Sequence, residues 1–271
     1  MKTIKLKPIN CSTRHTILLK KSLLIKNDKI FKSLKYNINK KFGRSKSCGQ
    51  ITSWHKQKGA KTLYRNLIKA PKTYKSVLIG SSYNPNTNSF TSILFDLQRK
   101  SFFNQLHTKN TYPGSLLEKS NKLTELKLGY KFEIKDIPTG TLICDLNTNK
   151  FQKKAKFIKA AGTLGQIIQK DTEKAIIKLP SNKTIQVPVS WTATIGSISN
   201  EIFTNTIIGK AGRSRNLGRR PIVRGIAMNP VDHPHGGRTN GGRPSVTPWG
   251  LPTKGKFKLK KRAKKSLRIY V

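Results

Sequence analysis

An excess of positive charge is the dominant feature of this sequence. The 271 residues include 55 Lys and Arg but only 11 Asp and Glu, a formal net charge of +44 at pH 7. A free globular enzyme of this size would repel itself at that charge, so the chain requires an anionic partner. Apolar residues make up 35% of the sequence, which suffices for modest β-cores but not for one large α/β core.

The acidic residues are unevenly distributed. None occurs from Lys29 through Phe95 or from His233 onward, and most lie between Asp96 and Glu201. The sequence therefore predicts a folded, less basic centre between two basic arms. A merely solvated charged face would not leave whole segments without counter-charge, and a membrane surface calls for an amphipathic helix that these Gly-, Pro- and Asn-containing stretches lack. Nucleic acid fits better, because neutralised phosphates release condensed counterions.

Other features exclude several classes of protein. No apolar run approaches the roughly 20 residues of a membrane-spanning helix, so we expect no membrane partner. Cys11, Cys48 and Cys144 are dispersed, which argues against a disulfide framework or a zinc site and favours a reducing compartment. The start, Met1 to Pro8, has no apolar signal region and no Arg-rich transit character, so we expect the product to stay where it is made.

The centre of the chain predicts short strands. Residues 75–80 and 90–95 are apolar and β-branched, and the Asn/Pro-rich stretch 84–88 between them has turn chemistry, so together they predict a hairpin. Residues 141–146 predict another strand. Residues 97–130 are ambiguous. Frequent turns and the absence of a long helical period indicate an all-β fold of small barrels.

A second hairpin is predicted over residues 174–189. Ala175, Ile177 and Leu179 alternate with lysines, and Ile185 and Val187 alternate with polar residues after a Pro-Ser-Asn turn. This pattern indicates an antiparallel pair with its apolar face inward. From Gly209 onward, apolar residues come singly among Gly, Pro, Arg and Lys, so we expect that segment to form no domain of its own and to order on a partner.

Long motifs in the last third resemble one known family. Gly209-Lys-Ala-Gly-Arg-Ser-Arg215, the run from Gly218 through Met228-Asn-Pro-Val-Asp-His-Pro-His-Gly-Gly237, and Pro248-Trp-Gly-Leu-Pro-Thr-Lys-Gly255 resemble the hallmark of the universal large-subunit ribosomal protein two family. Shorter matches follow the family's order upstream: Lys7-Pro8, Gly49-Gln-Ile-Thr52, Tyr83-Asn-Pro-Asn86, Ile137-Pro-Thr-Gly-Thr141 and Ala193-Thr-Ile-Gly196. The resemblance thus covers essentially the whole chain.

The chain departs from the family pattern at two loops and follows one branch at a third. Glycines of the family are replaced in 54–59 and in 147–156, although the second loop keeps positive charge at three lysines. Residues 236–243 are similar to the mitochondrial branch. Heavy use of Lys, Asn and Ile is typical of an AT-rich organelle genome. We therefore expect an organelle-encoded protein of the mitochondrial ribosome, with the bacterial cytoplasm as the alternative.

The resemblance implies both an architecture and a role. The architecture is a basic N-terminal extension (1–58), an OB-fold-like domain (59–118), an SH3-like barrel (119–200) and a basic C-terminal extension threading ribosomal RNA (201–271). The role is that of a structural, non-enzymatic constituent of the large ribosomal subunit, which binds its rRNA and supports subunit association and the peptidyl-transferase region. The expected partners are large-subunit rRNA, other large-subunit proteins and the small subunit at the intersubunit face. We expect no cofactor, no metal and no homo-oligomer.

Residue chemistry indicates where the RNA binds. Arginine offers planar forks for phosphates, tryptophan stacks on exposed bases, and glycine lets the backbone come close to both. The predicted RNA-binding residues are Trp54, His55, Tyr64, Arg65, Lys153, Lys154, Lys156, Lys210, Arg213, Arg215, Arg219, Arg220, Arg224, Asn229, His233, His235, Arg238, Arg243, Trp249 and Lys254.

Several alternatives stay open from the sequence. Trp54 either contacts RNA, the favoured interpretation, or caps a small core, whereas Trp191 lies within strand patterns and is expected in the core. The Asp232-His233-Pro-His235 run lacks the further ligands of a zinc site, and we expect its imidazoles to donate hydrogen bonds to RNA from a stiff loop. General acid–base catalysis of peptidyl transfer by His235 is the alternative function. A free nucleic-acid chaperone or DNA compactor is a further rival.

Overall fold

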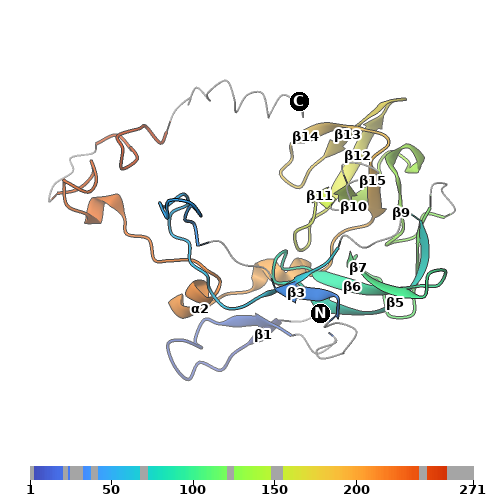
Figure 1. The fold of residues 1–271 in the computed structure, drawn as a ribbon, viewed down its shortest axis with the longest axis horizontal. Coiled ribbons are helices and arrows are strands. Elements are labelled where there is room, and N and C mark those ends of the chain that lie inside the picture. Colours follow the sequence, from blue (N-terminus) through green and yellow to red (C-terminus); the bar gives the residue numbers. More distant parts are fainter. Residues whose placement is uncertain are drawn as a thin grey trace. The chain divides into compact units, whose positions relative to one another are not determined.

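A computed structural model describes residues 3–20, 24, 33–37, 42–67, 73–120, 125–147, 155–237 and 243–254 (Figure 1). These residues fall into two compact units. Unit 1 is built from the described residues of 3–37 and 61–210. Unit 2 is built from those of 42–60 and 211–254, so it combines parts of both predicted extensions.

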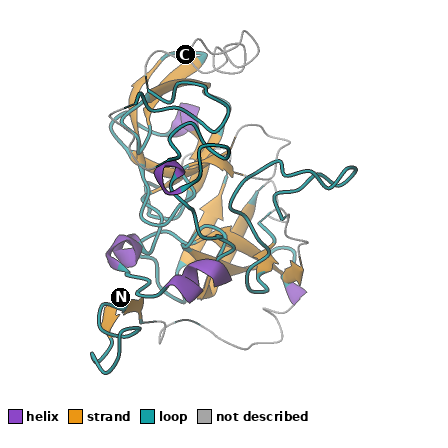
Figure 2. Ribbon diagram, turned by 90° about the vertical axis from the view of Figure 1, so that its left-hand side faces the viewer, coloured by secondary structure: helices purple, strands orange, loops and turns teal. Residues whose placement is uncertain are grey.

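The named strands all belong to unit 1, whereas the described part of unit 2 consists of loops, turns and two short helices (Figure 2 colours strands, helices and loops). The largest sheet of unit 1 contains β5 (Tyr74–Tyr83), β6 (Phe90–Asp96), β7 (Ser101–Leu106), β8 (Leu116–Lys119), β9 (Lys131–Glu133), β10 (Leu142–Asn147), β11 (Ala155–Phe157), β12 (Gly165–Lys170), β13 (Lys174–Lys178), β14 (Thr184–Pro188) and β15 (Thr192–Ile195). Its order is β14-β13-β12-β10-β15-β9-β8-β5-β6-β7, with β11 paired to β10. Its pairings are antiparallel except that of β8 with β9.

Two small sheets and a few short helices complete the described elements. β1 (Thr3–Lys5) pairs with β2 (Ile17–Leu19), and β3 (Lys35–Asn37) pairs with β4 (Leu63–Arg65). The helices are α2 (Ala211–Asn216) and the 3-10 turns η1 (Ile134–Asp136), η2 (Glu201–Asn205) and η3 (Gly225–Ala227). No helix in the described ranges is long and apolar enough to cross a membrane. The all-β class is confirmed, and the sheet is consistent with an OB-like and an SH3-like barrel.

The first predicted hairpin is confirmed. β5 and β6 pair antiparallel, with Val77 opposite Phe95. In the turn between them Asn88 has a left-handed backbone (φ 58°), which asparagine tolerates better than most residues. The Tyr83 hydroxyl donates a hydrogen bond to Asn88 Oδ1 over 2.9 Å and so supports the turn.

The second predicted hairpin is also confirmed, with the expected faces. β13 and β14 pair so that Ala175 faces Val187 and Ile177 faces Ile185. These four side chains are buried, whereas the lysines at both ends of β13 are exposed. Alternation with a period of two therefore decides which face of this hairpin enters the core.

The ambiguous stretch 97–130 contains β7 and β8. The sequence of β7, Ser-Phe-Phe-Asn-Gln-Leu, does not alternate, because Asn104 and Gln105 are polar and yet buried. Both are satisfied by distant partners. Gln105 Oε1 accepts the Tyr74 hydroxyl at 2.5 Å, and the Asn104 amide donates to the Leu34 carbonyl at 3.3 Å. A local pattern cannot reveal partners 31 and 70 residues away.

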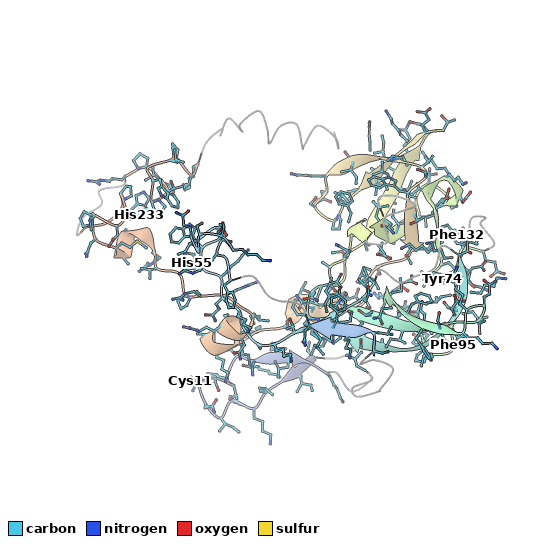
Figure 3. All side chains as sticks on the ribbon, viewed as in Figure 1. Cys11, His55, Tyr74, Phe95, Phe132 and His233 are labelled. Carbon is cyan, nitrogen blue, oxygen red and sulfur yellow. The ribbon has the colours of Figure 1, made fainter. Side chains whose placement is uncertain are left out.

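One apolar cluster extends across both predicted barrels of unit 1. It includes Tyr74 and Leu94 from the first and Phe132 and Trp191 from the second (Tyr74 and Phe132 are labelled in Figure 3). Trp191 is buried and stacks on Phe157 with 6.4 Å between ring centroids, as expected for a core residue. The division at residues 58, 118 and 200 stays a prediction.

An ion pair is buried beside this cluster. Lys131 Nζ lies 2.8 Å from Asp145 Oδ2, and both side chains are about nine-tenths buried. Lys119 is the register partner of Lys131 across β8 and β9. Burial, together with repulsion from Lys131, lowers the pKa of Lys119 to about 8.

Candidate nucleic-acid interface

Unit 2 brings together two segments that are far apart in the sequence. The backbone N–H of Arg220 donates to the His55 carbonyl at 3.0 Å, and that of Gln57 donates to the Gly218 carbonyl at 3.0 Å. The Gln57 side-chain amide also donates to the Arg215 carbonyl at 2.8 Å. Residues 55–60 therefore run along residues 215–220 as a short backbone pairing.

Glycines make this close approach possible. Gly218 has φ +90°, and a Cβ there would lie 2.7 Å from the Gln57 carbonyl oxygen. A Cβ on Gly59 would lie 2.4 Å from the Asn216 oxygen, and one on Gly236 would lie 2.2 Å from the Asn229 oxygen. The sequence predicts that glycines of the C-terminal segment let the backbone approach RNA, and the structure shows that Gly218 and Gly236 let it approach the chain itself.

Unit 2 has no apolar core in the part of the chain that the structure describes. Its buried residues are Gly43, His233 and Gly236, and no buried apolar side chain belongs to it. This agrees with the scarcity of apolar residues after Gly209. The structure differs from the expectation in one respect, since the described residues of 211–254 form a compact unit together with those of 42–60, with which they pair.

The charged side chains of this unit are almost all cationic. Its described residues include eleven Lys and Arg but only one acidic residue, Asp232. Most of these cations are exposed, including Arg215, Arg219, Arg220 and Arg224. With so little counter-charge inside the unit, its surface suits a polyanion.

Two tryptophans meet on this basic unit. The rings of Trp54 and Trp249 have centroids 5.9 Å apart at an interplanar angle of 57°. Trp54 is 56% exposed and Trp249 is 67% exposed. Trp54 therefore does not cap a buried core, and its ring is available for stacking.

A hollow of about 370 Å³ lies next to Trp54 within unit 2. It combines aromatic and cationic groups. Its lining includes Phe42, Arg44, Trp54, Lys56 and Arg220. Aromatic faces beside cations suit a nucleotide, whose base stacks while its phosphate is neutralised.

The two imidazoles of the Asp-His-Pro-His run make hydrogen bonds within the chain. His233 (labelled in Figure 3) is only 8% exposed, and its Nδ1 accepts the backbone N–H of His235 at 3.0 Å. Its ring occupies the space above Gly225, where a Cβ would lie 2.6 Å from Cε1. His235 Nε2 lies 2.9 Å from the Pro244 oxygen and 3.2 Å from the Val246 nitrogen. Both rings thus shape this loop.

The described residues contain no cluster of three or more His, Cys, Asp or Glu side chains suited to a metal ion. The Asp232 carboxylate of the same run is exposed.

The structure gathers most of the predicted RNA-binding residues into unit 2. Those on its exposed surface are Trp54, His55, Arg215, Arg219, Arg220, Arg224, Asn229, Arg243, Trp249 and Lys254. Arg213 and His235 are half-buried there. Lys153, Lys154 and Arg238 lie outside the described residues, and of Lys156 only the backbone, in β11, is described.

Three predicted residues belong to unit 1 instead. Lys210 is exposed, whereas Tyr64 and Arg65 lie half-buried on β4. The Tyr64 and Tyr36 rings pack with 5.2 Å between their centroids, and Arg65 Nη1 donates to the Leu63 carbonyl at 2.6 Å. Burial lowers the pKa of Arg65 and raises that of Tyr64.

Sequence reasoning missed three residues that line the hollow beside Trp54. Phe42, Arg44 and Lys56 come from a segment without any acidic residue, and that absence was the available signal. It indicated the segment but not the side chains that meet Arg220.

Comparison with known proteins identifies the family of the chain. Residues 127–250 match the family model for Ribosomal Proteins L2, C-terminal domain. The chain is 39% identical over 264 residues to the large ribosomal subunit protein uL2m of Reclinomonas americana, covering 95% of this chain and 94% of that protein. It is 41% identical over 254 residues to the large ribosomal subunit protein uL2 of Rickettsia felis, covering 92% and 91% of the two chains. Similarity at this level along nearly the full length of both partners shows that the chain belongs to the ribosomal protein L2 family.

Proposed function

We propose that this protein is a structural constituent of the large ribosomal subunit and that unit 2 binds large-subunit rRNA. The observation that carries the proposal is the charge of unit 2. Its described residues include eleven cations but only one carboxylate, together with two exposed tryptophans whose rings are in contact. Membership of the ribosomal protein L2 family supports the subunit assignment.

Binding to RNA accounts for the many cations and the lack of buried apolar side chains in the described part of unit 2. The described part of unit 2 has no buried apolar side chain and so gains little from the hydrophobic effect, and its cations would repel one another without a polyanion. Phosphates of RNA relieve that repulsion and release counterions. The hollow next to Trp54 offers stacking faces for bases exposed in single-stranded regions.

The finer roles follow from the family resemblance. The protein supports subunit association and the region around the peptidyl-transferase centre, contacts other large-subunit proteins and the small subunit, and is not an enzyme. Its ribosome is that of a mitochondrion, a location supported by the uL2m relative. Because Rickettsia proteins are also similar to the chain, the bacterial cytoplasm is the alternative location.

Sedimentation of the tagged chain in an organelle lysate, with sequencing of the co-purified RNA, tests this proposal. The chain should sediment with particles of large-subunit size and enrich large-subunit rRNA, and ribonuclease should release it. A nucleic-acid chaperone or DNA compactor would instead stay largely outside such particles. That distribution would contradict the proposal.

A further inference from the structure

Trp249 lies near the tip of a closed loop in unit 2, formed by residues 245–253. At the base of this loop the Thr253 N–H donates to the Ser245 carbonyl at 2.9 Å, and the hydroxyl oxygens of these two residues lie 2.6 Å apart. Near the tip Gly250 has a left-handed backbone (φ +78°), which glycine adopts without strain. The loop therefore holds the backbone of Trp249 in place.

The backbone is also held on both sides of Trp54. Before it, the Ser53 N–H donates to the Gly43 carbonyl at 3.0 Å, and after it, the His55 carbonyl accepts the Arg220 N–H at 3.0 Å. Only glycine fits at position 43, because a Cβ there would lie 2.3 Å from the Ser53 oxygen. Groups that are held before binding lose less conformational entropy when a ligand arrives.

The rings of Trp54 and Trp249 contact each other without stacking face to face. The angle between their planes is 57°, and both residues stay more than half exposed. Each ring therefore keeps a surface on which a further flat ring can pack. Proteins hold the bases of single-stranded nucleic acids on such aromatic faces, and this stacking tolerates any base.

The hollow beside Trp54 places cations next to that ring. Its volume of about 370 Å³ is within the range of small-ligand pockets. Arg44, Lys56 and Arg220 line it, all three are exposed, and the described lining contains no carboxylate. Arg44 donates one hydrogen bond to the Gly49 carbonyl at 2.9 Å, which leaves further guanidinium N–H groups for a phosphate. The hollow thus joins an aromatic face to accessible positive charge.

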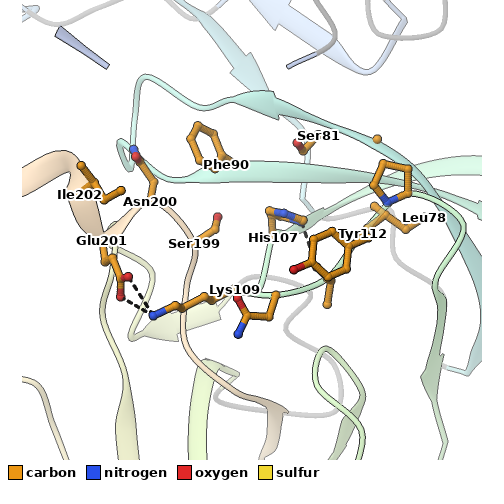
Figure 4. Close-up of a pocket in the computed structure, with 14 residues that line it drawn as sticks. Leu78, Ser81, Phe90, His107, Lys109, Tyr112, Ser199, Asn200, Glu201 and Ile202 are labelled. Atoms are coloured by element: carbon orange, nitrogen blue, oxygen red, sulfur yellow. Dashed lines mark hydrogen bonds and ion pairs between the residues drawn. The ribbon is translucent and has the colours of Figure 1, made fainter. Parts of the chain in front are cut away.

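A cavity of unit 1 lacks this combination (Figure 4). Phe90 and Tyr112 line it together with Lys109 and Glu201. Lys109 Nζ lies 2.8 Å from Glu201 Oε1, so the one lysine of the described lining is already paired with a carboxylate. Of these two sites, the hollow of unit 2 is therefore the one that suits a phosphate as well as a base.

We propose that the hollow binds one unpaired nucleotide of the RNA. The base stacks on the Trp54 ring, and Arg44 and Arg220 donate hydrogen bonds to the phosphates on either side of it. Trp249 is a positioning residue, since its contact limits the orientations of the Trp54 ring. In a double helix the bases stack on one another, so this site selects a nucleotide from a single-stranded region. The inference rests on the proposed function and names the kind of nucleotide that the site takes.

Binding of two short oligomers by the full chain tests this inference. One is a single-stranded adenosine hexamer, and the other is an abasic hexamer with the same phosphates. The wild-type chain should bind the adenosine oligomer at least about tenfold more tightly, and Trp54→Ala should reduce this preference by about tenfold, the effect of stacking one base. The affinity for the abasic oligomer should not change. Trp54→Phe keeps an aromatic face and should retain most of the preference.

Two further substitutions define the roles of the other aromatic residues. Trp249→Ala should lower the preference for bases, and Trp249→Phe should restore it, because a second ring again limits the orientation of Trp54. Tyr112→Ala is the matched control, since Tyr112 is an aromatic residue of unit 1 that is 68% exposed. It should leave the preference unchanged.

Fluorescence gives a second measurement of stacking. The chain has three tryptophans, so Trp54 is the only one left in the double variant Trp191→Phe/Trp249→Phe. Its emission should be quenched by the adenosine oligomer and not by the abasic one.

The outcomes separate this inference from the proposed function. An equal preference for bases in Trp54→Ala and in the wild-type chain, or unquenched emission of Trp54, would overturn the inference and leave the ribosomal assignment standing. If Trp54→Ala weakens the binding of both oligomers alike, the fluorescence measurement decides. Quenching of Trp54 in a chain that does not sediment with large-subunit particles would support the nucleotide site and contradict the proposed function.

Discussion

One buried imidazole links the stability of unit 1 to pH. His107 Nδ1 lies 2.8 Å from the Ser92 hydroxyl, and burial lowers the pKa of this histidine from 6.5 to about 4. Between these two values the unfolded chain binds a proton that the folded chain does not. The contribution of this histidine to stability is therefore fully present above pH 6.5 and is lost as the pH drops towards 4.

We expect the free energy of unfolding to decrease by about 2 kcal/mol between pH 7 and pH 5 through this group. Urea unfolding of the full chain at both pH values measures it. His107→Gln removes the imidazole and should reduce the pH dependence by that amount. His15→Gln, at an exposed imidazole, is the matched control. An unchanged pH dependence in His107→Gln would show that the ring does not stay neutral.

The sequence does not reveal which individual residues become buried or paired. Asn104 and Gln105 belong to the core because Leu34 and Tyr74 supply their hydrogen bonds from other elements. Trp191 was predictable, since it lies within strand patterns, whereas the burial of His233 depends on Gly225 leaving room for its ring.

At the scale of elements, the two hairpins were predictable and the pairing that builds unit 2 was not. β5–β6 and β13–β14 each join segments that are close in the sequence. Their alternating apolar residues predict the strands, and the turn residues between them predict the connection. The pairing of residues 55–60 with 215–220 has no periodic signal, because it depends on backbone groups and on glycines rather than on an apolar face.

Gly218 should be essential for this pairing. Gly218→Ala places a Cβ 2.7 Å from the Gln57 oxygen at φ +90°, so we expect the hydrogen bonds around Gln57 and Ala60 to break. Hydrogen exchange of the amides of these two residues should become at least about tenfold faster, the effect of about 1.4 kcal/mol.

Gly212→Ala is the matched control for that experiment. It lies in α2, where an added Cβ meets nothing within 4 Å, and alanine favours a helix. Equal exchange in both variants would contradict the role assigned to Gly218.

At the scale of the whole molecule, the net charge is +44, and the described residues of unit 2 contribute eleven cations against a single carboxylate. Arg219, Arg220 and Arg224 are exposed cations of unit 2. Their joint replacement by Ala should weaken binding to large-subunit rRNA. It should also flatten the plot of log K against log salt by about 0.7–0.9 for each phosphate that these arginines neutralise in the wild-type complex.

A charge-matched control separates direct phosphate binding from net charge. Lys174, Lys178 and Lys183 are exposed on the β13–β14 hairpin of unit 1, and their joint replacement by Ala removes the same three charges. Titrations of both triple variants over a range of salt concentrations should show a clearly smaller change of slope for the lysine variant. Equal slopes would mean that the three arginines bind no specific phosphates.

The sequence by itself determined the all-β class and the two hairpins, and it predicted a polyanionic partner. The balance of charged residues and the alternation of apolar and polar residues can be read from the sequence, because neither depends on the conformation of the chain. Only the tertiary structure decided that the described residues of 42–60 and 211–254 form one unit and that Asn104 and Gln105 are buried beside Leu34 and Tyr74. Those features arise where segments far apart along the chain meet, and their geometry depends on the room left by single glycines and on buried polar partners that no local pattern records.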